Sequence, residues 1–144
     1  MLNIKEIMEL LPHRFPFLMV DRILELEDDK KAVGIKNVTI NEPYFTGHYP
    51  EYPIMPGVML AEAIAQVGGI MILNSRRHLN IRPYLAGINN FKLRKPVYPG
   101  DQLILVTEII AVKGKLGKLR GKATVNGVVV AEGEFLFAMA AHED

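Results

Sequence analysis

The sequence predicts an α+β fold in which a curved antiparallel sheet wraps around one long central helix, with a short helix at the N-terminus. Residues 56–77 are apolar on nearly every helical face, which is typical of a helix enclosed by protein. Strand-like segments lie on both sides of it, and tight turns connect several of them. A helix that needs cover all round and a run of antiparallel strands fit together when the sheet curls around the helix.

Size and composition limit the class of protein. The chain has 144 residues, of which 49% are hydrophobic, so we expect one compact domain spanning 1–144. Its 17 basic and 16 acidic residues nearly cancel, which argues against a nucleic-acid or membrane partner. It has no cysteine, so disulfides, thiolate nucleophiles and thiolate metal sites are excluded. Early charged residues leave no room for a signal peptide or anchor, and we expect a cytoplasmic protein.

The long helix over 56–77 has ends that suit it. Pro56 is expected at its first position, and two arginines lie at its end, where the helix dipole favours positive charge. Glu62 and Gln66 make it too short and too polar to span a bilayer, so we expect a buried core helix. One sheet cannot enclose a helix completely, and the surface left bare predicts a second subunit.

The remaining segments supply the short helix and the strands. Apolar spacing predicts a helix over 4–11, which Pro12 ends. β-Branched and aromatic residues predict strands over 17–27, 32–38, 83–93, 101–112, 116–125 and 128–140.

The last two strands are expected to form a hairpin at the Asn-Gly pair 126–127. We favour a three-residue loop, which sets Arg120 opposite Glu132 and Lys118 opposite Glu134 and matches their charges. A strict two-residue loop would instead set Lys122 opposite Ala131.

The residues that carry chemistry lie where a stiff loop meets the long helix. Four prolines fall within fourteen residues of the loop, and each fixes one backbone angle. His48 lies on this loop, and an imidazole near neutral pH can accept a proton as a general base. The alternative is a histidine that only caps backbone groups of the loop.

Glu62 lies on an apolar helix, where desolvation favours the protonated form of a carboxyl group and so allows it to act as an acid. The alternative is that Glu62 pairs with a cation or joins Gln66, one turn on, in a polar seam. Between His48 and Glu62 the helix begins at Gly57, whose N–H has no helical acceptor and no side chain over it. This N–H can receive an oxyanion, unless water merely caps it.

Competing chemistries find little support. The histidines at 13, 48, 78 and 142 show no metal-ligand spacing, so we expect no metal site. Ser75 is the only serine and has no glycine elbow around it, which argues against a serine hydrolase. The segment 114–118 lacks both the spacing of a phosphate-binding loop and the helix that should follow it.

Residues 47–66 resemble the signature of the β-hydroxyacyl-acyl carrier protein dehydratases of bacterial fatty acid synthesis, specifically the Z type. That signature is Gly-His, an aromatic residue, Pro-x-x-Pro, then Met-Pro-Gly-Val and Glu-Ala-x-Ala-Gln, and every part is present. Residues 11–22 and 94–101 also look like the family, so the resemblance covers essentially the whole chain.

The resemblance implies a hot-dog fold and a dimer whose sheets join edge to edge, with three dimers often forming a hexamer. It implies dehydration of (3R)-3-hydroxyacyl-[acyl carrier protein] to the trans-2-enoyl thioester, a hydro-lyase reaction of type II fatty acid biosynthesis, without a cofactor. His48 of one subunit would be the general base and Glu62 of its partner the acid. The Gly57 N–H would steady charge on the thioester oxygen.

The implied partner is an acidic acyl carrier protein, which requires basic residues near the mouth of the acyl channel. Lys92 and Arg94 share one strand face, with Lys95 adjacent, and are the expected contacts. The alternative for each is an ordinary solvated side chain.

Three other functions stay open. A bifunctional dehydratase and isomerase would also make 3-enoyl thioesters; Glu62, where the isomerising A-type relatives carry aspartate, favours the Z type without excluding isomerisation. A hot-dog thioesterase would use water activated by a carboxylate and would leave His48 without a purpose. A non-catalytic acyl-thioester-binding module would resemble sensors that carry a DNA-binding region ahead of the domain, and only sixteen residues precede the first expected strand here.

Overall fold

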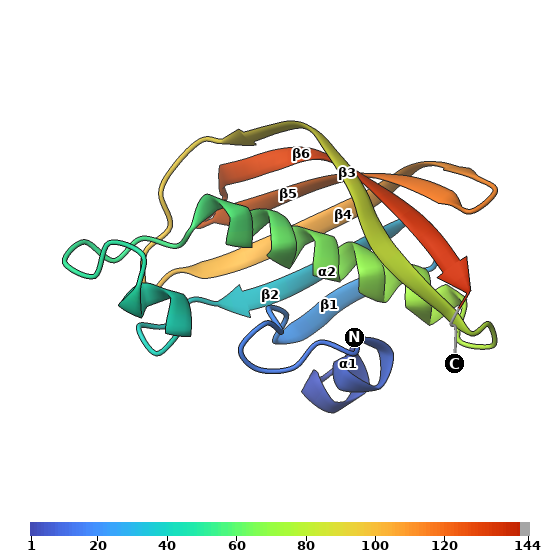
Figure 1. Ribbon diagram of the computed structural model, residues 1–144, viewed down its shortest axis with the longest axis horizontal. Coiled ribbons are helices and arrows are strands. Elements are labelled where there is room, and N and C mark those ends of the chain that lie inside the picture. Colours follow the sequence, from blue (N-terminus) through green and yellow to red (C-terminus); the bar gives the residue numbers. More distant parts are fainter. Residues whose placement is uncertain (142–144) are drawn as a thin grey trace.

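The computed structural model describes residues 1–141 and confirms the expected α+β hot-dog architecture (Figure 1). All strands pair antiparallel in one sheet of order β1-β2-β4-β5-β6-β3. The elements are α1 (Ile4–Leu10), β1 (Arg22–Glu27), β2 (Lys31–Asn37), the 3₁₀ helix η1 (Pro43–Thr46), α2 (Gly57–Ser75), β3 (Ile81–Leu93), β4 (Gln102–Lys113), β5 (Leu116–Val125) and β6 (Val128–Ala141).

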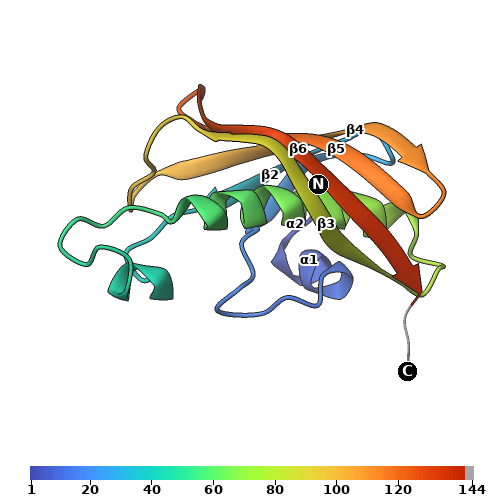
Figure 2. The ribbon, with the colours of Figure 1, turned by 45° about the horizontal axis from the view of Figure 1, so that its top comes forward.

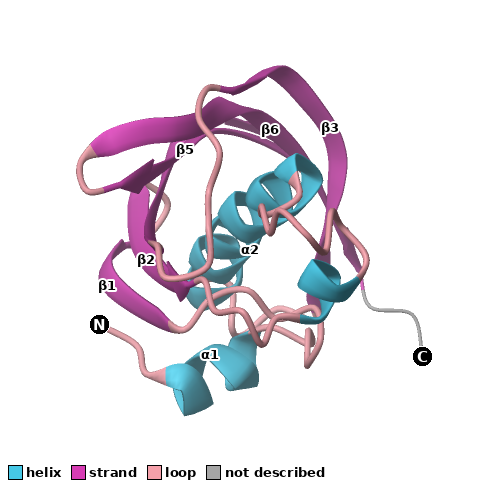
Figure 3. Cartoon of the chain, turned by 90° about the vertical axis from the view of Figure 1, so that its left-hand side faces the viewer, coloured by secondary structure: helices cyan, strands magenta, loops and turns pink. Residues whose placement is uncertain are grey.

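Helix α2 lies in the hollow of the sheet, which curls around it in Figure 3. It contacts all six strands, and α1 covers it on the side away from the sheet (Figure 2). By length and apolar composition α2 does pass as a membrane span, contrary to expectation, but 67% of the segment is buried inside the protein. The helix is therefore the core of the domain. Its burial, and not the polarity of Glu62 and Gln66, distinguishes it from a membrane-spanning helix.

The ends of α2 differ slightly from expectation. Pro56 is the N-cap residue instead of the first helical residue, and the helix ends at Ser75. Arg76, the C-cap residue, binds Asp29 with its Nη1 atom 2.7 Å from the carboxylate, and Asn74 donates to Asp28. The C-terminal end of α2 is thus fixed to the turn between β1 and β2.

The predicted strand over 17–27 was wrong in its first five residues, because β1 starts at Arg22. The side chain of Gln66 explains the difference. Its Nε2 donates to Phe17 O, and its Oε1 accepts from Met19 N, both at 2.7 Å. A buried glutamine on α2 therefore satisfies backbone groups that a strand would have paired with a neighbour.

Both predicted registers of the last hairpin were wrong. The loop has two residues, but a bulge follows after Thr124, so that Lys122 faces Glu132 and Arg120 faces Glu134. The extra residue lies on β6, where turn chemistry cannot reveal it. Charges on the two strands still match, and the expected pairing of Lys118 with Glu134 occurs as an ion pair at 3.0 Å, although the two residues are not directly opposite.

Strand β3 forms one edge of the sheet, and β6 is the one described strand that pairs with it. Large apolar side chains along it are at least 40% exposed, namely Tyr84, Leu85, Ile88 and Leu93. A long, apolar edge strand presents free backbone groups that favour pairing with another chain. This edge is where the structure leaves α2 and the sheet open.

Close packing of α2 on the sheet predicts a clear effect for Gly121→Ala. A Cβ atom at Gly121 would lie 2.3 Å from Ile64 Cγ2 on α2, so the helix must shift. We expect a loss of about 1–3 kcal/mol in the free energy of unfolding, measured by urea titration. Gly117→Ala is the matched control on the same strand and face, because its nearest contact would be Met139 Cε at 4.0 Å. Equal stability of the two variants would contradict the packing argument.

Candidate active site

The loop between β2 and α2 projects beyond the N-terminal end of the helix (Figure 1). Lys36, almost fully buried at the end of β2, forms an ion pair with Glu42, the residue that precedes η1. Phe45 in η1 packs into the core, and His48 N donates to Tyr44 O at 2.9 Å. The backbone at His48 is therefore held by a charged pair, an apolar anchor and a turn.

His48 is oriented by its own loop. The Nδ1 atom lies 2.9 Å from the backbone oxygen of Ile54. Since a carbonyl can only accept, Nδ1 carries the hydrogen and Nε2 of the neutral ring is free to take a proton. Tyr49, the next residue, has a φ angle of 49°, a left-handed conformation that is costly for a bulky side chain. This strained turn folds the loop back so that Ile54 reaches the imidazole.

Gly57 starts α2 beside this histidine. No side chain caps the helix at Pro56, and within residues 1–141 no acceptor is bonded to the Gly57 N–H. A Cβ atom at position 57 would lie 2.2 Å from Leu93 Cδ1, so the exposed Leu93 side chain packs over this glycine and would have to move for a larger residue.

His48 and Gly57 line the same cavity, which has a volume of about 300 Å³. Its walls come from the loop before α2 and from the end of β3 with the residues after it, among them Leu93, Lys95 and Val97. A base and a free amide donor therefore face one small space. That combination suits removal of a proton next to a carbonyl group whose oxygen gains charge.

Glu62 lines a different cavity, of about 200 Å³, farther along α2. His13, Gln66 and Tyr84 are among its other lining residues, and most of the wall is apolar. Burial raises the pKa of the Glu62 carboxyl above its ordinary value of 4.5, and a hydrogen bond from Gln66 offsets part of this effect. The carboxyl group therefore holds its proton at a higher pH than an exposed glutamate.

Within one chain the structure does not bring His48 and Glu62 together. The cavities that contain them share no lining residue. Strand β3 borders both: residues 82–85 line the cavity of Glu62, and Leu93 lines that of His48. Each cavity holds half of the predicted acid–base pair, and both open beside the exposed edge of the sheet.

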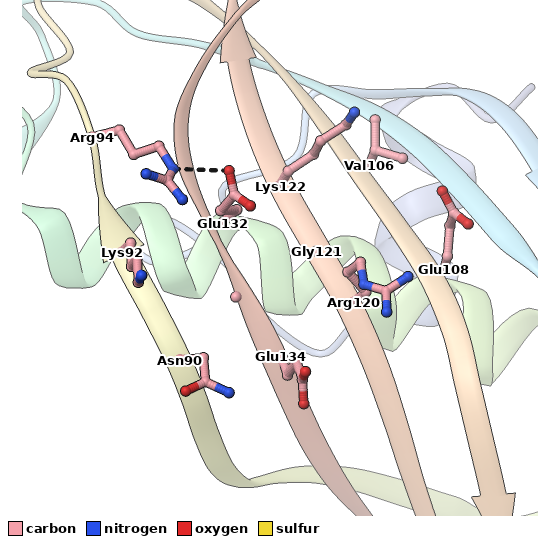
Figure 4. A pocket seen from close by; sticks show the side chains of 11 residues that line it. Asn90, Lys92, Arg94, Val106, Glu108, Arg120, Gly121, Lys122, Glu132 and Glu134 are labelled. Carbon is pink, nitrogen blue, oxygen red and sulfur yellow. Dashed lines mark hydrogen bonds and ion pairs between the residues drawn. The ribbon is translucent and has the colours of Figure 1, made fainter.

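The three basic residues differ in position. Lys92 lies on the outer face of the sheet, whereas Arg94, whose Nε binds Glu132 at 2.9 Å, borders both that face and the cavity of His48 (Figure 4). Lys95 follows the end of β3 and lines the cavity of His48. Of the three, Lys95 is the cation placed at the cavity without a carboxylate partner among residues 1–141.

Several residues of this region carry no local sequence signal. Gln66, which sequence reasoning paired with Glu62, also anchors the backbone at Phe17 and Met19. Leu93 covers Gly57, and Tyr52 meets Tyr98, only because distant segments converge. In the described part of the chain no group of His, Asp or Glu side chains is arranged to hold a metal ion.

Comparisons with known proteins agree with this architecture. A family model described as a FabA-like domain matches residues 11–134. The chain is 53% identical over 139 residues to the 3-hydroxyacyl-[acyl-carrier-protein] dehydratase FabZ of Geobacillus thermodenitrificans, covering 96% of each chain. It is 52% identical to the FabZ dehydratase of Caldicellulosiruptor bescii, covering 96% of this chain and 99% of the relative.

Solved structures show the same fold at low identity. The dehydratase heterocomplex ApeI:P from Xenorhabdus doucetiae superposes with a TM-score of 0.79 at 16% identity, over 95% of this chain and 91% of that one. A hypothetical thioesterase with coenzyme A from Streptococcus pneumoniae superposes with a TM-score of 0.65 at 14% identity, over 85% and 88%.

The raised pKa of Glu62 predicts a pH-dependent stability difference for Glu62→Gln. An acid whose folded pKa lies above its unfolded value loses stability as pH rises through the folded pKa, and glutamine removes this loss. The free energy of unfolding of the variant minus that of the wild type should increase between about pH 4 and about pH 8. Urea titrations at several pH values measure it, with Glu9→Gln, at an exposed carboxyl, as the charge control. A difference that is flat with pH would show that burial does not perturb Glu62.

Proposed function

The chain belongs to the FabA-like domain family, and on that premise we propose that it is a 3-hydroxyacyl-[acyl-carrier-protein] dehydratase of fatty acid biosynthesis. The relatives that support this proposal match over nearly their whole length. The observation that carries the chemistry is the pairing of an oriented imidazole with a free amide in one cavity. The burial of α2 fits a soluble enzyme, and we place its action in the cytoplasm.

In the proposed reaction, His48 Nε2 removes a proton from C2 of a (3R)-3-hydroxyacyl thioester. The Gly57 N–H donates to the thioester oxygen, which gains negative charge as the C2–H bond breaks. Protonated Glu62, directly or through a water, gives its proton to the hydroxyl on C3, and the C3–O bond breaks to release water. The product is the trans-2-enoyl thioester, and a proton returns from His48 to Glu62 through solvent.

We further propose that Glu62 reaches this reaction from a second subunit. Two observations support it: His48 and Glu62 line separate cavities of one chain, and β3 borders both. Antiparallel pairing of β3 with its own copy about the strand midpoint would set residues 82–85 of one subunit beside residues 89–92 of the other. The Glu62 cavity of one subunit would then adjoin the His48 cavity of its partner.

The same pairing accounts for the exposed apolar side chains of β3. Tyr84, Leu85 and Ile88 would be covered in the dimer, which removes the cost of an apolar edge in water. Each dimer would hold two active sites, and three dimers would assemble into a hexamer, as the resemblance implies.

We propose Lys95 as the main contact for the acidic acyl carrier protein. It lines the His48 cavity, into which the thioester must pass, and has no carboxylate partner among residues 1–141. Lys92 and Arg94 are supporting contacts, since Lys92 faces the outer sheet surface and Arg94, although it also lines the His48 cavity, is paired with Glu132 (Figure 4). A single cation at such a position mainly raises the rate of association with the carrier protein and lowers KM.

The shared site predicts recovery of activity in mixed dimers. His48→Ala and Glu62→Gln should each lower kcat by about a hundredfold or more, because each removes one proton-transfer group. After denaturation and refolding together in equal amounts, the two variants should regain about one quarter of wild-type activity, since half of the dimers are mixed and each mixed dimer has one intact site. The activity is measured as the rate of hydration of a trans-2-enoyl thioester, monitored by the decrease in the absorbance of the enoyl group.

Two outcomes would contradict the proposal. Full activity in either single variant would remove that residue from the mechanism. Inactive mixed dimers, shown to form by light scattering and native mass spectrometry, would mean that both groups act within one chain.

Lys95→Glu predicts a selective loss toward the carrier protein. KM for the acyl carrier protein substrate should rise about three- to thirtyfold, while kcat/KM for a short N-acetylcysteamine thioester should stay within about twofold. Lys115→Glu, in the turn at the far end of the molecule in Figure 1, is the matched control and should change neither value. An equal decrease in kcat/KM for both substrates would show that Lys95 affects the reaction itself and not the docking of the carrier protein.

A further inference from the structure

We propose that Tyr52 and Tyr98 form a clasp that positions His48, so that both tyrosines are positioning residues for proton transfer. This inference rests on the proposed function. The two residues lie on the two loops that wall the His48 cavity, and their hydroxyl oxygens are 3.0 Å apart.

The clasp has two components. The hydroxyl groups share a hydrogen bond, and the rings meet edge to face with centroids 6.1 Å apart. The bond to Tyr52 raises the pKa of the Tyr98 phenol, which keeps the hydroxyl protonated and the clasp intact across the neutral range. Both side chains are more than a third exposed, so the contact does not serve to build the core.

The segment that carries Tyr98 is rigid. Val97 is fully buried, and the turn after it is closed by Tyr98 N donating to the Asp101 carboxylate and Asp101 N donating to Tyr98 O. This turn is tied to the sheet through Val38, whose N donates to Asp101 O and whose O accepts from Gly100 N. Tyr98 is therefore the fixed member of the clasp.

The loop that carries Tyr52 is the dependent member. Within residues 1–141, two hydrogen bonds join it to the rigid turn: Met55 N to Val97 O at 2.8 Å, and Tyr52 to Tyr98. The Ile54 carbonyl and the Met55 N–H belong to one planar peptide group, so the Met55 bond holds one side of this group and the tyrosine pair holds the chain that leads into it. Its carbonyl oxygen is the acceptor for His48 Nδ1, so the position of this oxygen decides which ring nitrogen is free to act as base.

Loss of the clasp would leave Ile54 attached on one side only. The loop would then visit conformations in which the carbonyl no longer meets Nδ1, and in those the imidazole can adopt the other tautomer with its proton on Nε2. Such a ring cannot take a proton from the substrate at Nε2. The rate falls by the fraction of molecules in the wrong arrangement, while substrate binding, made elsewhere in the cavity, changes little.

The test uses Tyr52→Phe, Tyr98→Phe and the double variant in the full-length protein, since each change removes one exposed hydroxyl. Each single variant should lower kcat by about two- to tenfold, the factor that corresponds to one ordinary hydrogen bond, with KM within about twofold. The double variant should be no slower than the slower single variant, because both changes break the same bond. Imidazole ¹⁵N spectra of histidine-labelled protein, with the His48 signal assigned through His48→Gln, should show more of the Nε2–H tautomer in each variant.

Wild-type kcat in both single variants, multiplicative losses in the double variant, or an unchanged His48 tautomer would each overturn the clasp. If Tyr98→Phe fails to fold, Tyr52→Phe tests the same bond from the exposed loop. A wild-type protein without dehydratase activity would defeat the proposed function, whereas the ¹⁵N spectra would still decide whether the clasp sets the His48 tautomer.

Discussion

Helix α2 buries most of its length against the concave face of the sheet, and this contact places Gly57 and Glu62 and supports the loops that carry the rest of the site. The helix begins at Gly57, which fixes the position of the Gly57 amide. Ala61 is buried in the core, whereas its neighbour Glu62 lines a cavity. Close approach is possible because each side contributes a glycine: Gly68 on α2 leaves room for Leu119, and Gly121 on β5 leaves room for Ile64. A helix held this tightly is a rigid support, which catalysis by fixed donors requires.

The loops add to this support by convergence. The loop before α2 is fastened at Lys36, at Phe45 and at the turn after Val97, and the imidazole is oriented within it. The strained conformation of Tyr49 is tolerated because the surrounding bonds over-determine it. Strain of this kind concentrates where a side chain must be aimed, and here it adjoins His48.

Glu62 and His48, the proposed acid and base, lie in separate cavities of a single chain. Glu62 lines a mostly apolar cavity, where burial raises the pKa of its carboxyl group, while His48 and Gly57 line another. Exposed apolar residues along β3 lie between the two cavities and explain why a second copy would complete the site. The same edge that would make a monomer prone to association thus serves the chemistry.

The sequence by itself determined the α+β class, the two α-helices and the approximate positions of the strands along the chain, because apolar periodicity and turn residues are local signals. It also singled out His48, Gly57 and Glu62, through a stiff loop and a carboxyl on an apolar helix. Only the tertiary structure decided where β1 begins, which residues face each other across the last hairpin, and that Leu93 covers Gly57. These depend on a buried glutamine, a bulge and a packing contact between residues far apart in the chain, and no local pattern encodes such contacts.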